Sequence, residues 1–208
     1  MRRQDPVLAP FGSGLVLIDG PLLIGLAASG DLATVDVWFD GRLRVSQNTP
    51  AEIRDAWANG VPGADLDTDA QVVAVADAGD DVATQTALGR QWRTLADMWR
   101  QGSMSEGRAR GLATSFVTAK HRNIPLLTHH EQAWVAAAPS SGVPRRVQIG
   151  GIVEVALVGV KAAAIDPASA WELYSRVAST AAGFQPEWKM ARRGDFLGWA
   201  GEAAAGRL

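Results

Sequence analysis

Three acidic residues stand where a folded chain could bring carboxylates together. Asp19 directly follows the apolar run Leu15-Val16-Leu17-Ile18, Glu52 ends the motif Thr49-Pro50-Ala51-Glu52, and Glu106 follows Ser105 at the start of an alanine-rich segment. Carboxylate oxygens are ligands that suit Mg²⁺ and Mn²⁺. A cation held in this way polarises a phosphate and lowers the pKa of a bound water. The chemistry that these acids indicate is therefore hydrolysis of phosphodiester bonds.

Each acid also has a simpler interpretation as a helix cap. Asp19 precedes Gly20-Pro21, a common start of a helix after an Asp cap. Thr49-Pro50-Ala51-Glu52 and Ser103-Met104-Ser105-Glu106 both match the capping box, in which the acid reaches back to the amide of the cap residue. A helix N-terminus keeps a carboxylate ionised, so capping and cation binding are compatible. The sequence leaves both roles open.

Polar residues beside these acids extend the candidate site. His129 and His130 follow Thr128 at the end of an apolar run, and Asp55 lies about one turn after Glu52. Successive strand residues point to opposite sides, so at most one of the two histidines would naturally face the site. Imidazole favours Mn²⁺ over Mg²⁺. The candidate phosphate or RNA contacts are basic residues that follow Glu106, although such residues are often only solvated: Arg108, Arg110, Lys120 and Arg122.

The hydrophobic pattern predicts strands that alternate with helices. Strands are expected over 15–18, 35–39, 42–46, 71–76 and 124–128, with Asp40-Gly41 as a turn between the second and third. Helices are expected over 21–28, 49–58, 81–100, 106–122, 131–137, 151–164 and 167–182. This order predicts an α/β fold, a three-layer αβα sandwich with a mainly parallel central sheet. The site of such a fold lies beyond the carboxyl ends of its strands, where Asp19 and Thr128 fall.

The composition narrows the class of protein. The chain has 208 residues, a formal net charge of −2 and no cysteine. A net charge this small gives no overall electrostatic attraction for nucleic acid, although it is compatible with a local basic patch. The lack of cysteine excludes disulfides, thiolate nucleophiles and cysteine-bound zinc. The longest apolar stretch is too short to span a bilayer and no signal peptide is evident, so a cytoplasmic protein without a membrane partner is expected.

In order and spacing, these motifs resemble the PIN-domain nucleases, a family that includes the VapC-type toxins. The segment 15–27 is similar to the family's first strand, its terminal Asp and its apolar helix, and the segment 49–53 is similar to the Thr-x-Ala-Glu-Leu context of its second acid. Ser105-Glu106, with Leu112-Ala113 after it, stands in the place of the third. The family's closing strand often reads Leu-Leu-Thr-Asp-Asp, whereas this chain has Leu126-Leu127-Thr128-His129-His130. The resemblance covers roughly Leu15 to Phe184.

The resemblance implies a PIN-like domain at 15–138, between an N-terminal arm at 1–14 and a C-terminal helical extension at 139–208. It implies a metal-dependent endoribonuclease in which Asp19, Glu52 and Glu106, with His129 and His130 at the fourth position, hold one or two Mg²⁺ or Mn²⁺ ions. RNA would be the substrate, the chain would form a homodimer, and an antitoxin protein would be its partner if it is a toxin. The replaced fourth acid supports an alternative, a degenerate module that binds RNA or protein without cutting. A third interpretation is an unrelated α/β binding domain whose acids are only caps.

Overall fold

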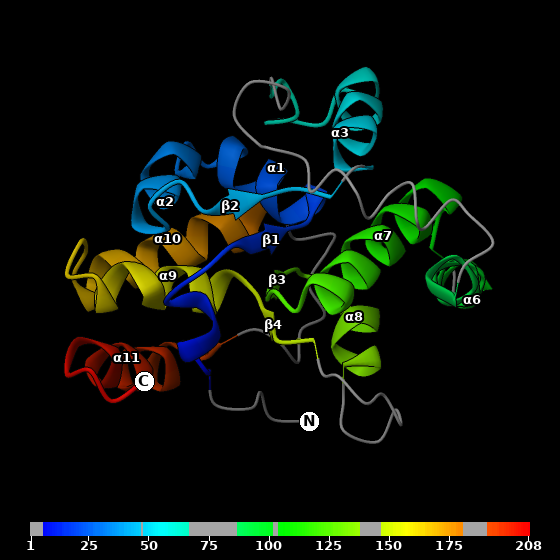
Figure 1. Cartoon of the computed structure of the whole chain (residues 1–208). Coiled ribbons are helices and arrows are strands. Elements are labelled where there is room, and N and C mark those ends of the chain that lie inside the picture. The colour runs from blue at the N-terminus through cyan, green and yellow to red at the C-terminus, as the bar shows by residue number, and fades with distance from the viewer. Residues whose placement is uncertain (1–5, 47, 67–86, 102–103, 138–146, 181–190) are drawn as a thin grey trace.

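The computed structural model describes residues 6–46, 48–66, 87–101, 104–137, 147–180 and 191–208. Figure 1 shows short strands at the centre with helices on both sides. In chain order the elements are η1 (Ala9–Phe11), β1 (Val16–Ile18), α1 (Gly20–Ala28), α2 (Leu32–Trp38), β2 (Leu43–Arg44), α3 (Thr49–Ala58), α6 (Ala87–Gln101), α7 (Glu106–Arg122), β3 (Leu126–Leu127), α8 (Glu131–Ala136), β4 (Ile149–Gly150), α9 (Ile152–Lys161), α10 (Pro167–Thr180) and α11 (Arg193–Ala204).

The described strands form one parallel sheet in the order β2-β1-β3-β4. Leu17 is in register with Leu126, and Leu126 is in register with Ile149. Because every strand runs in the same direction, the residues after β1, β3 and β4 reach one edge of the sheet together. The class predicted from the sequence, an α/β fold with a parallel sheet, is confirmed.

Helices cover both faces of this sheet, as three layers require (Figure 1). On one face, Val16, Ile18 and Leu127 share a buried apolar cluster with α1, α2 and α9 to α11. On the other face, Leu17 and Leu126 pack with α6, α7 and α8. The alternation of Val16, Leu17 and Ile18 between the two clusters follows from the two-residue period of a strand.

The helix α7 begins and ends where the sequence predicts. Ser105 caps its first turn by accepting a hydrogen bond from the Arg108 amide, and Asn123 ends it in the left-handed conformation, with φ of 55°. The helix α6 packs on α7 through two tryptophans. The Trp99 ring meets Phe116 edge to face, at a centroid distance of 6.1 Å, and the Trp92 indole donates to the Thr114 hydroxyl at 3.0 Å. These contacts fix α6 against α7.

One predicted strand is wrong. The sequence pattern predicts an extended segment over 35–39, yet Leu32–Trp38 is the helix α2. Val35 and Trp38 are both buried and lie three residues apart, which matches one face of a helix rather than one face of a strand. Trp38 lies so close to Gly159 of α9 that a methyl group on that glycine would be 2.7 Å from its ring. The strand predicted over 71–76 lies outside the described residues.

The segments at the two ends of the chain contribute to the core. Leu8 and Phe11, from the predicted N-terminal arm, are each 1% exposed, and the Phe11 ring occupies the space beside Gly150. In the predicted extension, β4 is the fourth described strand of the sheet, and α9 to α11 belong to the same apolar cluster as β1. The boundary predicted at 138–139 lies outside the described residues.

Among the described residues, no single helix is both long and apolar enough to cross a membrane. The helices α1 and α2 reach that length when they are taken together, but they bend by 116° between them.

Candidate functional site at the carboxyl edge of the sheet

The polar side chains predicted from the sequence begin at the carboxyl edge of the sheet. Asp19 follows β1 and Thr128 follows β3, one position beyond the paired residues Ile18 and Leu127. The Asp19 amide donates to the Leu127 carbonyl at 3.0 Å, which extends the strand pairing to this point. Both side chains lie on the side of the sheet that α7 covers, because they are two residues from Leu17 and Leu126.

The Asp19 carboxylate is buried and held in place by two donors. Its Oδ1 accepts a hydrogen bond from the Leu22 amide in the first turn of α1 at 3.0 Å, and its Oδ2 accepts one from the Thr128 hydroxyl. The Thr128 oxygen in turn accepts from the His130 amide at 3.0 Å. Asp19 is therefore the N-cap of α1, as the simpler interpretation expects, and it is also joined to the end of β3. The two roles coexist.

Glu52 does not act as the cap of α3. Asn48 occupies the cap position and makes no side-chain cap bond, while Thr49 is hydrogen bonded instead to the Ser46 hydroxyl at 3.0 Å. The Glu52 carboxylate extends away from its own helix towards Gly20 of α1 and Gly111 of α7. A methyl group on Gly111 would lie 1.7 Å from Glu52 Oε1, and one on Gly20 would lie 2.9 Å from Oε2. The carboxylate thus occupies a space between α1 and α7, here called the glycine cradle, that is open because residues 20 and 111 have no side chain.

Asp19 and Glu52 are close enough to repel each other. Burial raises the pKa of Asp19 to about 7, although the hydrogen bonds from Thr128 and Leu22 oppose this shift. Burial and then the charge of Asp19 raise the pKa of Glu52 to about 8; Arg108 opposes the increase and Asp55 adds to it. Two carboxylates with raised pKa values favour any positive charge placed between them. A cation beside the two carboxylates would therefore relieve their repulsion.

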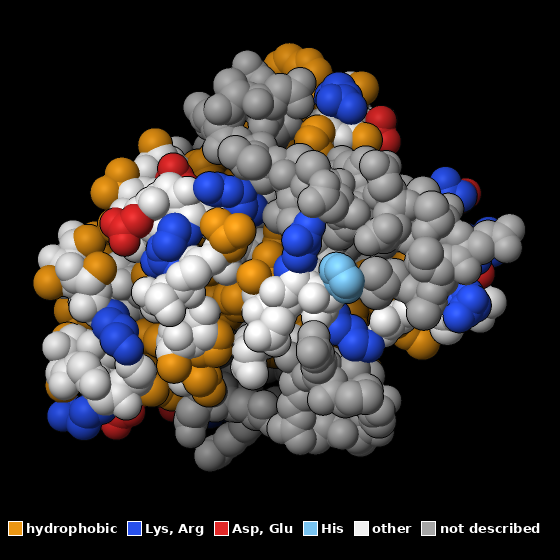
Figure 2. All heavy atoms as spheres, in the orientation of Figure 1, with side chains coloured by type: hydrophobic (Ala, Val, Ile, Leu, Met, Phe, Trp, Pro, Cys, Tyr) orange, Lys and Arg blue, Asp and Glu red, His pale blue; other side chains and the backbone are white. Residues whose placement is uncertain are grey.

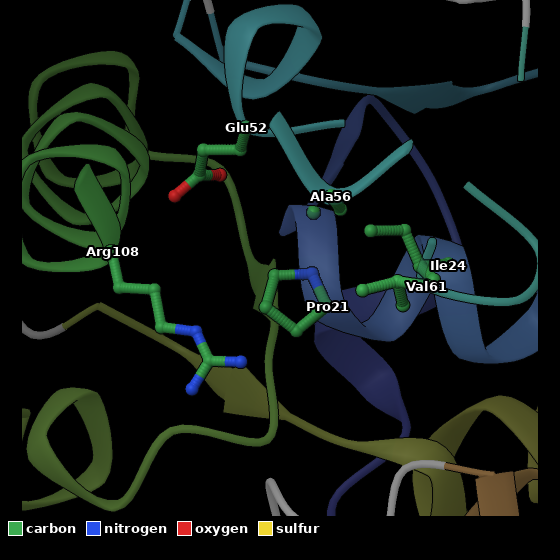
Figure 3. Close-up of a pocket in the computed structure, with 7 residues that line it drawn as sticks. Pro21, Ile24, Glu52, Ala56, Val61 and Arg108 are labelled. Carbon is green, nitrogen blue, oxygen red and sulfur yellow. The ribbon is translucent and has the colours of Figure 1, made fainter. Parts of the chain in front are cut away.

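Arg108 of α7 and a small pocket complete this region. The pocket has a volume of about 80 Å³, and its lining residues are Gly20, Pro21, Ile24, Glu52, Ala56, Val61 and Arg108. Figure 3 shows the Glu52 carboxylate and the Arg108 guanidinium on one side of Pro21, with Ile24, Ala56 and Val61 on the other. Of the basic residues predicted to contact RNA, Arg108 is the one that lies beside the acids.

The structure does not bring Glu106 into the pair. Its side chain is exposed, and Oε1 forms an ion pair with Arg110 of the next turn at 2.7 Å. At 100° per residue, Glu106 lies roughly 140° around the α7 axis from Gly111, against which Glu52 packs. Arg110 is thereby engaged on the outer side of the helix. The third acid of the predicted cluster is at the correct helix end but on a different face.

The remaining predicted residues lie in three different places. His129 and His130 are buried at the end of β3, 2% and 8% exposed, beside the Thr128 that binds Asp19. Asp55 is exposed on α3 and acts on Glu52 through its charge. Lys120 and Arg122 lie in the last turn of α7, about 18 Å or more along the axis from Arg108. They are therefore separated from the pocket.

The residues that sequence reasoning missed are Gly20, Gly111 and the apolar lining of the pocket. Gly111 did carry a signal, because a glycine inside a helix costs about 1 kcal/mol relative to alanine and often marks a close approach. The apolar residues Ile24, Ala56 and Val61 carried none, since nothing in their local pattern shows that they meet.

The donor set suits a cation that keeps much of its own hydration. In the part of the chain that is described, no three Asp, Glu or His side chains gather into a metal site. Mg²⁺ is commonly held by only one or two carboxylates, with water and substrate phosphate as its other ligands. Asp19, Glu52 and the Thr128 hydroxyl offer hard oxygens of this type. The residues present therefore fit such an ion, with fewer acids than the sequence predicted.

Comparison of the chain with protein-family models, with curated proteins and with solved structures finds no match.

Substitution of Thr128 tests how Asp19 is positioned. Thr128→Val removes the hydroxyl that joins Asp19 to the His130 amide, and it leaves both buried groups without this bond. We expect a loss of about 1–3 kcal/mol in the free energy of unfolding, as for other buried groups that lose a partner. Thr128→Ser keeps the hydroxyl and should retain most of the stability. Urea denaturation of both variants measures the difference, and equal losses would show that the hydroxyl does not hold Asp19.

Proposed function

We propose that the chain is a metal-dependent nuclease that hydrolyses phosphodiester bonds of RNA, with Asp19 and Glu52 as its central acids. The observation that carries the proposal is that Asp19, held by the Thr128 hydroxyl at the carboxyl edge of a parallel sheet, is near enough for its charge to raise the pKa of Glu52. This is the edge at which α/β folds place their ligands. The order of the motifs along the chain, similar to that of PIN-domain nucleases, supports the same conclusion.

Asp19 and Glu52 would hold Mg²⁺ or Mn²⁺, which when bound would polarise the phosphate and make a coordinated water more acidic. Asp19 contributes a fixed oxygen, because Leu22 and Thr128 hold its carboxylate in one orientation. Glu52 approaches from α3, a separate element, and its cradle between Gly20 and Gly111 restricts where its oxygens lie. Arg108 contributes the positive charge that a phosphate requires near the acids.

The charged surface gives RNA few other contacts. On the face shown in Figure 2, the described Lys and Arg side chains lie in separate places and do not merge into one patch. With a net charge of −2, attraction over a distance is weak. We therefore expect RNA binding that is local to the site and that requires the cation.

The direct test is cleavage of single-stranded RNA by the purified chain with Mg²⁺ or Mn²⁺. Glu52→Gln should lower the rate at least about 100-fold, the scale of losing one preorganised charge at an active site. Glu106→Gln is the matched control, because that acid lies on another face of α7 in an exposed ion pair with Arg110. It should keep the rate within a few-fold.

Two outcomes would change the assignment. If Glu106→Gln were as inactive as Glu52→Gln, the third acid would reach the site in the active form. If the chain with both acids intact cleaved no RNA in either cation, the alternative of a module that binds without cutting would replace the nuclease. The exposed position of Glu106 is the observation that favours this alternative.

A further inference from the structure

Three buried hydroxyl groups lie beside the glycine cradle, and the hydrolysis proposed above gives them no part. Ser46 follows β2, Thr49 is in the first turn of α3 and Ser115 is on α7, and all three are fully buried. The Ser46 oxygen lies 3.0 Å from the Thr49 hydroxyl and 2.9 Å from the Ser115 hydroxyl. These three residues, here called the hydroxyl bridge, join the end of a strand to two helices.

The hydroxyl bridge lies about one helical turn from the glycine cradle. Ser115 comes four residues after Gly111 and therefore lies on the same face of α7. Thr49 comes three residues before Glu52 on α3, and its methyl group would lie 3.5 Å from a methyl group placed on Gly20. The bridge thus determines where the first turn of α3 lies on α7, one turn from the point where the Glu52 carboxylate meets Gly111.

A second hydrogen bond between the same two helices lies next to the bridge. Asn48, at the N-cap position of α3, donates to the Thr114 hydroxyl at 2.8 Å. Thr114 also accepts a hydrogen bond from the Trp92 indole, and it donates its own hydrogen to the Arg110 carbonyl at 2.9 Å. The start of α3 is therefore bonded to α7 at two consecutive residues, Thr114 and Ser115.

The apolar packing of α3 is limited, so these bonds matter for its position. Thr49 and Ile53 are the residues of α3 that are fully buried, and Figure 1 shows the helix at the edge of the molecule. Apolar contact has no preferred direction, so Ile53 does little to fix the rotation of the helix. Hydrogen bonds require a set distance and angle, and a satisfied buried network specifies one arrangement.

We propose that Ser46, Thr49 and Ser115 are positioning residues of the candidate site, and that their hydroxyl bridge places the Glu52 carboxylate in the glycine cradle. The proposal rests on the nuclease function, since that function assigns Glu52 to the reaction. The three hydroxyls are buried and act on the reaction only through Glu52. Loss of the bridge should therefore lower kcat and leave KM for RNA within a few-fold, because a misplaced acid weakens stabilisation of the transition state.

The test separates position from stability with two variants. Ser46→Ala removes the central hydroxyl and leaves those of Thr49 and Ser115 without this partner, so both kcat and stability in urea should fall, kcat at least about tenfold. The combined variant Ser46→Ala/Thr49→Val/Ser115→Ala has no unpaired hydroxyl, so most of the stability should return. Its kcat should stay as low as that of Ser46→Ala. A purely stabilising role would restore both.

Two conservative variants serve as controls. Thr49→Ser keeps the hydroxyl and should retain kcat within a few-fold, whereas Thr49→Val, which keeps the shape of the side chain, should lose it. Ser175→Ala removes a serine hydroxyl that donates to the Trp171 carbonyl on α10, far along the chain from the bridge, and should leave kcat unchanged.

Amide hydrogen exchange distinguishes failure of this proposal from failure of the nuclease function, because it needs neither RNA nor a cation. In Ser46→Ala, exchange of the α3 amides should accelerate at least about tenfold more than exchange of the α10 amides. Equal acceleration in both helices would overturn the proposal, as would native kcat in the folded combined variant. Faster exchange confined to α3, in a chain that cleaves no RNA, would support the bridge and refute the nuclease.

Discussion

Asp19→Asn is expected to make the protein more stable at pH 8, by up to about 4 kcal/mol, while it removes the RNA cleavage. Folding raises the pKa of Asp19 from 3.8 to about 7 because the carboxyl group is buried. A raised pKa means that the folded state holds its proton more tightly than the unfolded state does. Each tenfold gain in proton affinity corresponds to about 1.4 kcal/mol, so a gain of about a thousandfold sets the upper limit.

The pH dependence follows from the direction of this change. Below pH 3.8 both states keep the proton and Asp19 carries no penalty. As the pH rises from there to about 7, the unfolded state releases its proton first, so the native chain loses stability across this window. Asparagine cannot ionise, so the variant should not show this loss. Its advantage should be small at pH 4 and full at pH 8.

Urea denaturation of both proteins at pH 4 and pH 8 measures this difference. Asp195→Asn is a suitable control, because Asp195 is exposed in the first turn of α11 and away from Glu52. If the difference in stability between Asp19→Asn and the native chain stayed the same at pH 4 and pH 8, the carboxylate would not be penalised, because the loss of the Thr128 hydrogen bond alone does not change over this pH range. Addition of Mg²⁺ or Mn²⁺ should raise the melting temperature of the native chain and leave that of Asp19→Asn nearly unchanged, since a ligand of the folded state stabilises it.

Gly111→Ala is expected to lower cleavage about 100-fold, although it adds only one methyl group. That methyl would lie 1.7 Å from Glu52 Oε1 and 2.2 Å from Cδ, so the carboxylate must leave its cradle. A displacement of about 1 Å at a catalytic group can cost this factor. The cation affinity, measured as the shift in melting temperature with Mn²⁺, should fall together with the rate.

The same helix supplies the control. Gly107 lies in α7 one turn earlier, and a methyl group there would meet no atom within 4 Å. Gly107→Ala should therefore retain activity, and it should gain a few tenths of a kcal/mol in stability because alanine favours a helix. If both glycine variants retained activity, the position of Glu52 in the cradle would not matter for the reaction. If both variants lost activity equally, the loss would come from a general effect of alanine on α7 and not from the contact with Glu52.

The sequence predicted the position of Asp19 well, because the signal is local. An apolar strand, an acid and Gly-Pro lie within a few residues of one another, and the acid is found both as the cap of α1 and at the end of β1 beside Thr128. Glu52 could not be assigned in this way. The Glu52 side chain could cap its own helix or extend towards α1 and α7. The choice depends on Gly20 and Gly111, which lie far from Glu52 in the sequence.

Two other predictions show the same limit. Glu106 starts α7 as its motif predicts, yet the rotation of that helix against the sheet decides which residue faces the acids, and it selects Arg108. The segment 35–39 is rich in β-branched and aromatic residues, yet Val35 and Trp38 are buried on one face of the helix α2, where Trp38 packs against Gly159 of α9. The pocket forms where α1, α3 with the turn after it, and α7 meet, so no single segment of the sequence predicts it.

The extreme shortness of the strands has a consequence for how this chain can vary. Among the described strands, β1 has three residues and β2, β3 and β4 have two each, so none is more than one residue longer than the two-residue repeat of its side chains. Deleting or inserting one residue in Val16–Ile18 would turn Asp19 to the opposite face of the sheet and away from Thr128. Sequences that descend from this one should therefore keep their length in the few residues before Asp19 and Thr128, because a shift of one position there would separate the two side chains that form the site.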